Sequence, residues 1–154
     1  MTRATEFVTA FMQALEAKEF TKAAAYLSDS MILIGFTPAP LPKNQFINVM
    51  SGLAEGFPNL LYNLSGVEEV AETMGGNRIR GTVQITGSQV NSFKLPPLGI
   101  GPIPQMAASV SLPAENWEYQ LENNAIVSIR IARKPGGGIE GLLNQLGIHD
   151  PIIQ

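Results

Sequence analysis

The sequence predicts an α+β fold, with helices packed on one face of a curved, mainly antiparallel sheet. In roughly the first sixty residues, apolar side chains recur every three or four positions, which is the period of amphipathic helices. The rest consists of short segments that alternate or are β-branched, separated by Gly-Gly-Asn and Asn-Asn turns. Because a sheet that bends around helices leaves a conical space, we predict a cone-shaped architecture with an interior pocket.

Three N-terminal helices are predicted. The first spans about residues 5–17, and the second is a short helix in FTKAAAYL, residues 20–27. The third begins near Phe46 and closes at Gly56 and Pro58, since glycine and proline end helices. A buried strand, MILIGF at residues 31–36, separates the second helix from the third, and Ser28-Asp29-Ser30 is expected to end the second helix.

Strands dominate the remainder of the chain. They are predicted near residues 60–70, 78–90, 106–112, 115–122 and 126–133. In the fourth of these, Trp117 and Tyr119 share one face, and Glu118 occupies the other because successive side chains of a strand alternate. A short C-terminal helix is predicted in GIEGLLNQLG, residues 138–147. No repeat or linker is visible, so residues 1–154 are predicted to form one domain.

Composition excludes several classes of function. The net charge is -3 and the cationic residues are scattered, which argues against nucleic acid and anionic membrane surfaces as partners. With no cysteine and with His149 as the one histidine, thiol nucleophiles and a metal site are not expected. No glycine-rich phosphate loop follows a strand, so no cofactor is predicted. No segment is apolar enough to span a bilayer, and the expected location is cytoplasmic.

The segment NSFKLPPLGIGPIPQ, residues 91–105, is unusual. It holds four prolines and two glycines among five large apolar side chains, and Lys94 is its only charge. Such a segment is too apolar for a solvated loop. Its side chains therefore need shielding by an apolar ligand, the pocket rim or another chain. Whether this loop is a lid over the pocket or a dimer contact stays open.

Several segments in series resemble the SnoaL-like polyketide cyclases, within the wider nuclear transport factor 2-like superfamily. AAAYLSDSMILIG and NQFINVMSGLAEGFPNL are similar to that family's helix-to-strand passage and to its helix ending in Ala-Phe-Pro-Asp-Leu. TGSQVNSFKLPPLG, YQLENNAIV and GLLNQLG resemble its later motifs in the same order. The resemblance covers nearly the whole chain. It implies the family's cone: three N-terminal helices on a curved sheet, a short C-terminal helix and frequent homodimers.

The resemblance also bears on chemistry. Family cyclases are expected to close a ring by an aldol reaction, with an acidic general base on or near the last strand. The matching positions here are the run Ser128 to Ile131, and Gln89 matches the family's histidine. Both changes remove titratable groups. The comparison therefore implies a pocket for a small hydrophobic or aromatic molecule that does not retain the aldol-cyclase base.

An enzyme of the cyclase or isomerase type, acting on a hydrophobic carbonyl compound by general acid–base catalysis, remains the alternative. Its candidate bases are Glu118 and Glu140, although Glu118 is also expected to pair with a surface arginine such as Arg130. Arg130 is alternatively predicted to reach into the cone and bind a ligand anion. The predicted ligand-binding residues are Tyr26, Phe46, Met50, Tyr62, Gln89, Trp117, Tyr119 and Arg130.

Overall fold

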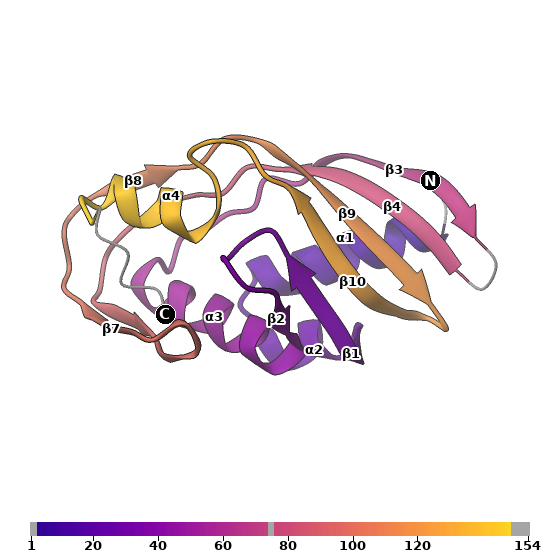
Figure 1. The fold of residues 1–154 in the computed structure, drawn as a ribbon, viewed down its shortest axis with the longest axis horizontal. Helices are drawn as coiled ribbons and strands as arrows, with labels where there is room; N and C mark the ends of the chain where they lie inside the picture. The colour runs from indigo at the N-terminus through magenta and orange to yellow at the C-terminus, as the bar shows by residue number, and fades with distance from the viewer. Residues whose placement is uncertain (1–2, 74–75, 149–154) are drawn as a thin grey trace.

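The computed structural model describes residues 3–73 and 76–148, so that His149 lies outside the described residues. Within these ranges the α-helices are α1 (Arg3–Glu16), α2 (Phe20–Ala24), α3 (Lys43–Gly56) and α4 (Gly138–Gln145), and η1 (Pro96–Leu98) is a 3₁₀ turn. The strands are β1 (Leu27–Ile34), β2 (Leu41–Pro42), β3 (Ser65–Thr73), β4 (Gly76–Val83), β5 (Thr86–Ser88), β6 (Phe93–Leu95), β7 (Ile100–Ile103), β8 (Ser109–Ser111), β9 (Glu115–Glu122) and β10 (Ala125–Ala132) (Figure 1). The predicted α+β class is confirmed.

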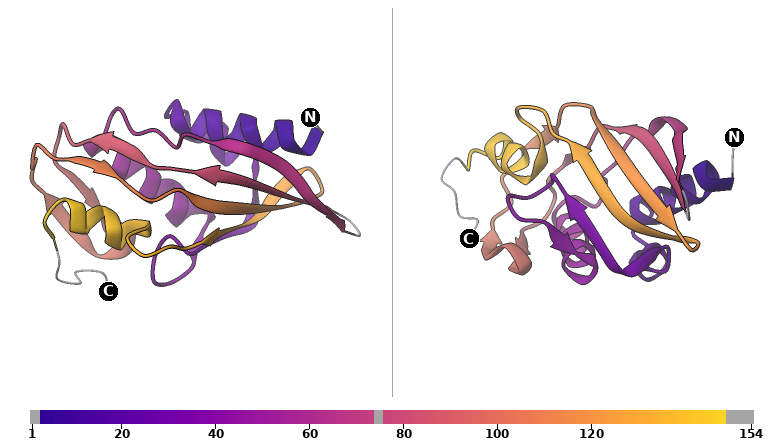
Figure 2. Two further views of the ribbon diagram at one scale, coloured as in Figure 1. Left: turned by 90° about the horizontal axis from the view of Figure 1, so that it is seen from above. Right: turned by 45° about the vertical axis from the view of Figure 1, so that its right-hand side comes forward.

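The main sheet is mixed and curved. Its six strands run in the order β2-β1-β10-β9-β4-β3, and β5–β8 and β6–β7 form two small additional ribbons. β1 pairs with β10 in parallel, and the other neighbours in the main sheet are antiparallel. Helix α1 packs on β3 and β4, and α3 packs on β1 and β6 (Figure 2). The sheet and these two helices enclose the hydrophobic core.

The start of β1 differs from the prediction. Ser28-Asp29-Ser30 was expected to end a helix, but α2 ends at Ala24 and these polar residues lie inside β1. The reason is tertiary: Leu27 pairs with Ile126 of β10, which extends the strand past the polar residues. The register between β1 and β10 shifts between Leu27 and Ile32, so the polar residues occupy an irregular part of the strand.

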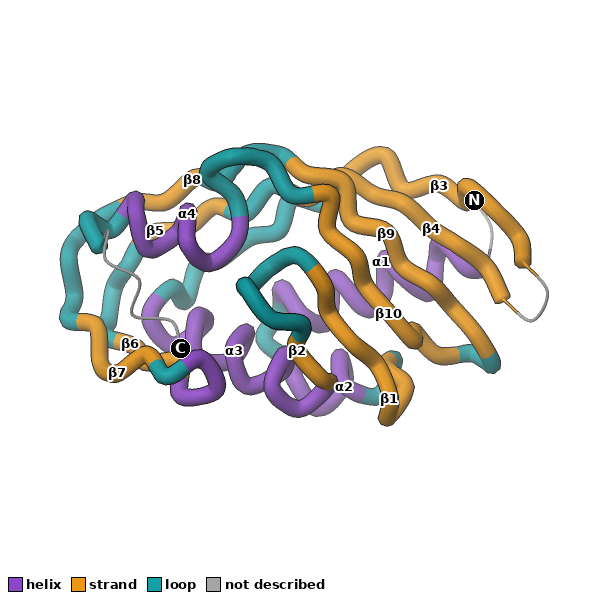
Figure 3. Tube along the Cα trace, viewed as in Figure 1, coloured by secondary structure: helices purple, strands orange, loops and turns teal. Residues whose placement is uncertain are grey.

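The Pro-rich segment is a packed hairpin, made of β6, η1 and β7, beside α3 (Figure 3). All of its large apolar side chains are buried; they are Phe93, Leu95, Leu98, Ile100 and Ile103. Two glycines of α3 allow the close approach, because a Cβ atom at Gly56 would lie 2.5 Å from the Phe93 ring and one at Gly52 would lie 2.6 Å from the Lys94 carbonyl oxygen. The predicted need for a ligand, a pocket rim or a second chain is corrected: these side chains are buried within the same chain, and α3 packs on β6 and η1.

The alternating side chains of β9 show that the sheet has an apolar inner face and a charged outer face. Trp117 and Tyr119 are buried, while Glu118 between them is partly exposed, which confirms the predicted alternation. On the outer side, Glu68 of β3, Arg80 of β4, Glu118 and Arg130 of β10 follow one another in register across four strands. This row alternates negative and positive charges, which is the favourable arrangement for cross-strand neighbours.

Candidate ligand-binding site

Three aromatic side chains meet in the core. The Trp117 ring centroid lies 6.4 Å from that of Tyr62 and 6.4 Å from that of Tyr119, and all three residues are buried. We call Tyr62, Trp117 and Tyr119 the aromatic cluster. Met50 of α3 adjoins it, because the Tyr62 hydroxyl donates to the Met50 sulfur at 3.4 Å. Four of the predicted ligand-binding residues are thus brought together.

Phe46 and Tyr26 belong to a neighbouring aromatic group. The ring of Phe11 lies 6.5 Å from that of Phe46 and 6.3 Å from that of Tyr26, measured between centroids. Phe46 is fully buried, whereas Tyr26 is partly buried and also contacts Phe7 edge-on. These two predicted residues therefore share a second apolar group that is centred on α1.

The hydroxyl of Tyr119 is buried and has no hydrogen-bond partner among the described residues. A buried donor without a partner costs about 1–3 kcal/mol relative to a satisfied one. Burial also raises the pKa of Tyr119 well above its ordinary value, so the phenol keeps its proton and stays a donor. An acceptor atom brought beside it would recover the missing hydrogen bond.

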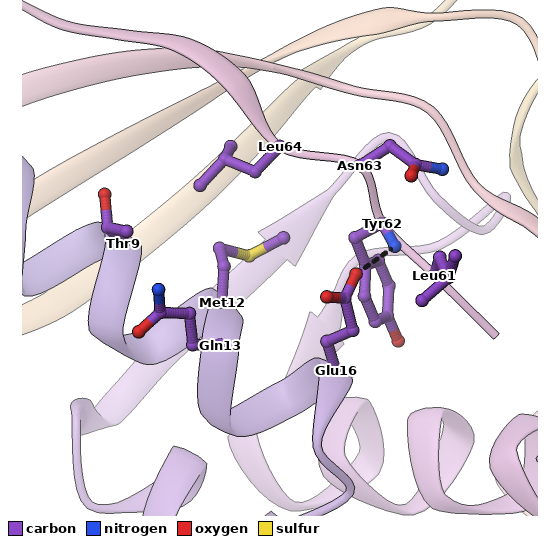
Figure 4. Close-up of a pocket in the computed structure, with 8 residues that line it drawn as sticks. All are labelled: Thr9, Met12, Gln13, Glu16, Leu61, Tyr62, Asn63 and Leu64. Atoms are coloured by element: carbon purple, nitrogen blue, oxygen red, sulfur yellow. Dashed lines mark hydrogen bonds between the residues drawn. The ribbon is translucent and has the colours of Figure 1, made fainter. Parts of the chain in front are cut away.

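A groove of about 310 Å³ lies between α1 and residues 61–64, and we call it the α1 groove (Figure 4). Its lining residues are Thr9, Met12, Gln13, Glu16, Leu61, Tyr62, Asn63 and Leu64. Glu16 accepts a hydrogen bond from the Tyr62 backbone N–H at 2.8 Å. Because Tyr62 also belongs to the aromatic cluster, this residue joins the groove to the buried rings. Burial, and secondarily the negative charge of Glu16, raises the pKa of the Tyr62 phenol.

The sequence analysis did not single out two carboxylates, Glu16 in the α1 groove and the buried Glu115. Glu16 follows the buried Leu15 and is four residues after Met12, at the border of the apolar stripe of α1. Glu115 is buried on the inner side of β9, where the alternation with Trp117 would have placed it. Its Oε2 accepts from the Lys134 backbone N–H at 2.8 Å and lies against Gly137, so it holds the turn before α4.

The predicted bases lie on the surface. Glu118 forms an ion pair with Arg78 at 3.4 Å, and Glu140 forms one with Arg133 at 3.3 Å. A surface arginine such as Arg130 was expected to pair with Glu118. Arg130 does stand opposite Glu118 in the register, but the ion-pair partner is Arg78, a diagonal neighbour on β4. Arg130 is exposed on the outer side of the sheet. The structure does not bring these three side chains to the aromatic cluster.

Gln89 is buried, but its amide serves the hairpin. Its nitrogen donates to the carbonyl oxygens of Pro104 at 2.9 Å and Asn91 at 3.1 Å, and its oxygen accepts from the Met106 N–H at 2.9 Å. These contacts use both ends of the side chain, so Gln89 acts as a brace inside the hairpin rather than as a group presented to the cluster.

Two kinds of feature, metal-binding clusters and membrane-spanning helices, are absent from residues 3–73 and 76–148. In this part of the chain, no three histidine, cysteine, aspartate or glutamate side chains gather closely enough to bind a metal ion. The same residues contain no helix that is long and apolar enough to cross a membrane.

The fold is shared with proteins of known structure, although the sequence matches no protein-family model and no curated protein. A candidate polyketide cyclase from Xanthomonas campestris superposes with a TM-score of 0.67 at 12% identity, covering 94% of this chain and 96% of the other. A SnoaL-like polyketide cyclase from Agrobacterium tumefaciens superposes at 0.62 and 13% identity, covering 88% and 94%. The chain has the SnoaL-like fold.

A nuclear transport factor 2-like protein of unknown function from Cytophaga hutchinsonii also has this fold, with a TM-score of 0.55 at 15% identity over 88% of this chain and 93% of the other. At such low identities the similarity establishes architecture, and chemistry has to be argued from the side chains. In this SnoaL-like fold, the inner side of β10 carries Ile126, Ile129 and Ile131, which are all buried.

Proposed function

We propose that the protein binds a small hydrophobic or aromatic molecule against the aromatic cluster, without the proton abstraction of an aldol cyclase. The observation that carries this proposal is the unpartnered hydroxyl of Tyr119 within a group of buried rings. Rings supply apolar contact area, and one positioned donor orients a carbonyl or ether oxygen of the ligand.

Entry is proposed through the α1 groove. The cluster residues are almost completely enclosed by side chains of the chain itself, so a ligand must displace some of them. Met12 lines the groove and Met50 contacts the Tyr62 hydroxyl. Methionine side chains are unbranched and change rotamer readily, which suits them to make way for a ligand. The proposed path runs from the groove, past Tyr62, to Tyr119.

The absence of base catalysis is supported by the residues on β10. The segment that matches the family's acidic strand presents Ile129 and Ile131 to the interior, and the exposed Arg130 lies between them. A base that removes a carbon-bound proton needs a carboxylate or imidazole in contact with the ligand. Isoleucine offers apolar surface in its place.

Fluorescence of the single tryptophan tests the proposal, because Trp117 lies in the cluster. Acetophenone and ethylbenzene are of similar size, and acetophenone has a carbonyl group where ethylbenzene has a methylene group. We expect saturable fluorescence changes with both and about fivefold tighter binding of acetophenone, equivalent to one hydrogen bond of about 1 kcal/mol. The variant Tyr119→Phe should abolish this preference, whereas Tyr26→Phe should keep it. Absence of saturable binding, or a preference that survives in Tyr119→Phe, would contradict the proposal.

The enzymatic alternative is favoured by one observation, the carboxylate of Glu16 beside Tyr62 in the groove. A base of this kind would exchange the methyl protons of acetophenone for deuterium in heavy water, which proton nuclear magnetic resonance measures. Exchange above the buffer rate that is lost in Glu16→Gln would establish an enzyme. If Glu118→Gln or Glu140→Gln abolished it instead, the originally predicted bases would be correct. Exchange at the buffer rate supports binding without turnover.

The predicted homodimer stays a prediction. Leu98 and Ile100 are buried within their own chain, so polar substitutions there would disturb the fold. Val90 and Met106 flank the hairpin and are exposed by 53% and 44%. Light scattering of the double variant Val90→Ser, Met106→Ser therefore tests whether this side of the molecule joins two copies.

A further inference from the structure

We infer that the α1 groove selects ligands that carry a cationic ammonium group on an apolar body. This inference rests on the proposed function and deepens it by naming the outer end of the ligand. Glu16 is the one charged residue among the groove's lining residues, so the groove carries a single negative charge. A cation is the complementary head group, and an anion would be repelled.

The hydrogen-bonding state of the lining residues supports the same choice. The Thr9 hydroxyl donates to the Thr5 carbonyl oxygen at 2.8 Å, and the Asn63 amide nitrogen donates to the Gln84 carbonyl oxygen at 2.8 Å and to the Thr86 hydroxyl at 3.1 Å. The donors of Thr9 and Asn63 are thus engaged within the protein, whereas the amide of Gln13, which also lines the groove, offers both a donor and an acceptor. What Thr9, Glu16 and Asn63 offer to a ligand is acceptor oxygen atoms, and an ammonium group is a donor of three hydrogen bonds with no acceptor of its own.

The carboxylate of Glu16 is held in a defined position. One of its oxygens accepts from the Tyr62 backbone N–H at 2.8 Å, and the other points away from Tyr62, toward the side of the groove where Met12 lies (Figure 4). The second oxygen, which does not contact the Tyr62 N–H, can accept from an ammonium group. Met12, Leu61 and Leu64 provide apolar contacts for the adjoining carbon chain. A charge-assisted hydrogen bond of this type is stronger than one between neutral groups.

Three compounds with the same body separate the contribution of charge from that of apolar contact. Phenylbutylamine is cationic, phenylbutanol is neutral and phenylbutyrate is anionic at neutral pH. Isothermal titration calorimetry should give the affinity order amine, alcohol, carboxylate, with the amine about tenfold tighter than the alcohol, as expected for a charge-assisted contact that is partly exposed. Added salt should reduce this preference because it screens partly exposed charges.

Glu16→Gln is the decisive variant, since its amide oxygen can still accept from the Tyr62 N–H. The affinity for the amine should fall to within about twofold of that for the alcohol, because the negative charge that attracts the ammonium group is gone. Glu6→Gln is the matched control: it removes the same charge from an exposed position of the same helix and should leave the preference unchanged.

The outcomes distinguish this inference from the proposed function. If acetophenone binds as expected but the amine shows no preference over the alcohol, the inference is wrong and the binding function stands. If the amine preference depends on Glu16 but Tyr119→Phe has no effect on acetophenone, the groove is a site in its own right and the inner site is wrong. If none of the three compounds binds at millimolar concentration, or if Glu16→Gln retains the preference, the inference is overturned.

Discussion

The Pro-rich hairpin and the aromatic cluster are both apolar and buried, but they differ in how their polar groups are satisfied. At the base of the hairpin, the side chain of Gln89 makes three hydrogen bonds to backbone groups. In the cluster, the Tyr119 hydroxyl has no partner within the described part of the chain. A region built for stability pairs its buried polar groups, whereas a binding site can leave a donor open for its ligand. This difference favours a structural role for the hairpin and is the basis of the binding role proposed for the cluster.

The largest expected effect is in the hairpin. Phe93 is buried, and its ring centroid lies 5.4 Å from that of Phe57. Phe93→Ala leaves a cavity between the hairpin and α3, and should lower the free energy of unfolding by about 3–5 kcal/mol. Urea denaturation followed by circular dichroism measures it. The neighbouring exposed Lys94→Ala should change stability by less than about 0.5 kcal/mol. Equal effects of the two substitutions would show that the hairpin is not a packed element.

The cluster should make the protein sensitive to alkaline pH. In the unfolded chain Tyr62 and Tyr119 ionise near the ordinary pKa of 10.0, and burial raises the pKa of both in the folded chain. Above about pH 10 the folded chain therefore binds more protons than the unfolded chain, and the free energy of unfolding falls by about 1.4 kcal/mol per pH unit for each tyrosine. Below about pH 10 both tyrosines are protonated in the folded and in the unfolded chain, so their burial stabilises the fold in full.

Urea unfolding across this alkaline range measures the slope, and the double variant Tyr62→Phe, Tyr119→Phe should show a shallower one. Tyrosinate absorbance gives an independent check. If both tyrosines of the folded protein ionised near the ordinary value, the enclosed state of the cluster would be refuted.

Removing the brace of the hairpin should have an intermediate effect. Gln89→Ala leaves backbone groups of Asn91, Pro104 and Met106 without their partner. The expected loss is about 1–2 kcal/mol in the free energy of unfolding, since three partly buried hydrogen bonds are removed. Lys94→Ala, an exposed side chain of the same hairpin, is the control and should be near neutral. A neutral Gln89→Ala would mean that water replaces the side chain.

The smallest effect should come from Tyr119→Phe. Because the hydroxyl has no partner, its removal should change the free energy of unfolding by less than about 0.5 kcal/mol or raise it. Tyr62→Phe, which loses the contact with the Met50 sulfur, should cost more. Urea denaturation measures the free energy of unfolding of both variants. A loss above about 1 kcal/mol for Tyr119→Phe would mean that this hydroxyl already has a partner and is not held for a ligand.

Periodicity was sufficient where one local pattern decides the structure. Residues 115–122 were predicted as a strand with Trp117 and Tyr119 on the buried face, and β9 has those bounds and that alternation. The hairpin was read as a loop because its prolines oppose strand formation locally. Its short strands β6 and β7 pair with each other, and they pack against the glycines of α3. These glycines are distant from the hairpin in sequence, so a local pattern does not reveal the contact.

The α1 groove could not be predicted because it joins α1 to residues 61–64, and only the folded chain brings Glu16 to the Tyr62 backbone. Glu115 is a different case, since the alternation that identified Trp117 applies equally to it. The ion pair of Glu118 depended on which of three arginines reaches it. The register places Arg80 and Arg130 opposite Glu118, but the ion pair forms with the diagonal neighbour Arg78, so strand register alone does not decide that choice.

The parallel pairing of β1 with β10 has a consequence for synthesis. Leu27 finds its partner Ile126 roughly a hundred residues later in the chain. At ribosomal rates of about 5–20 residues per second, β1 waits roughly 5–20 seconds before the strand beside it emerges. During that interval the nascent chain has one long strand edge uncovered, and chaperones have their best opportunity to bind it.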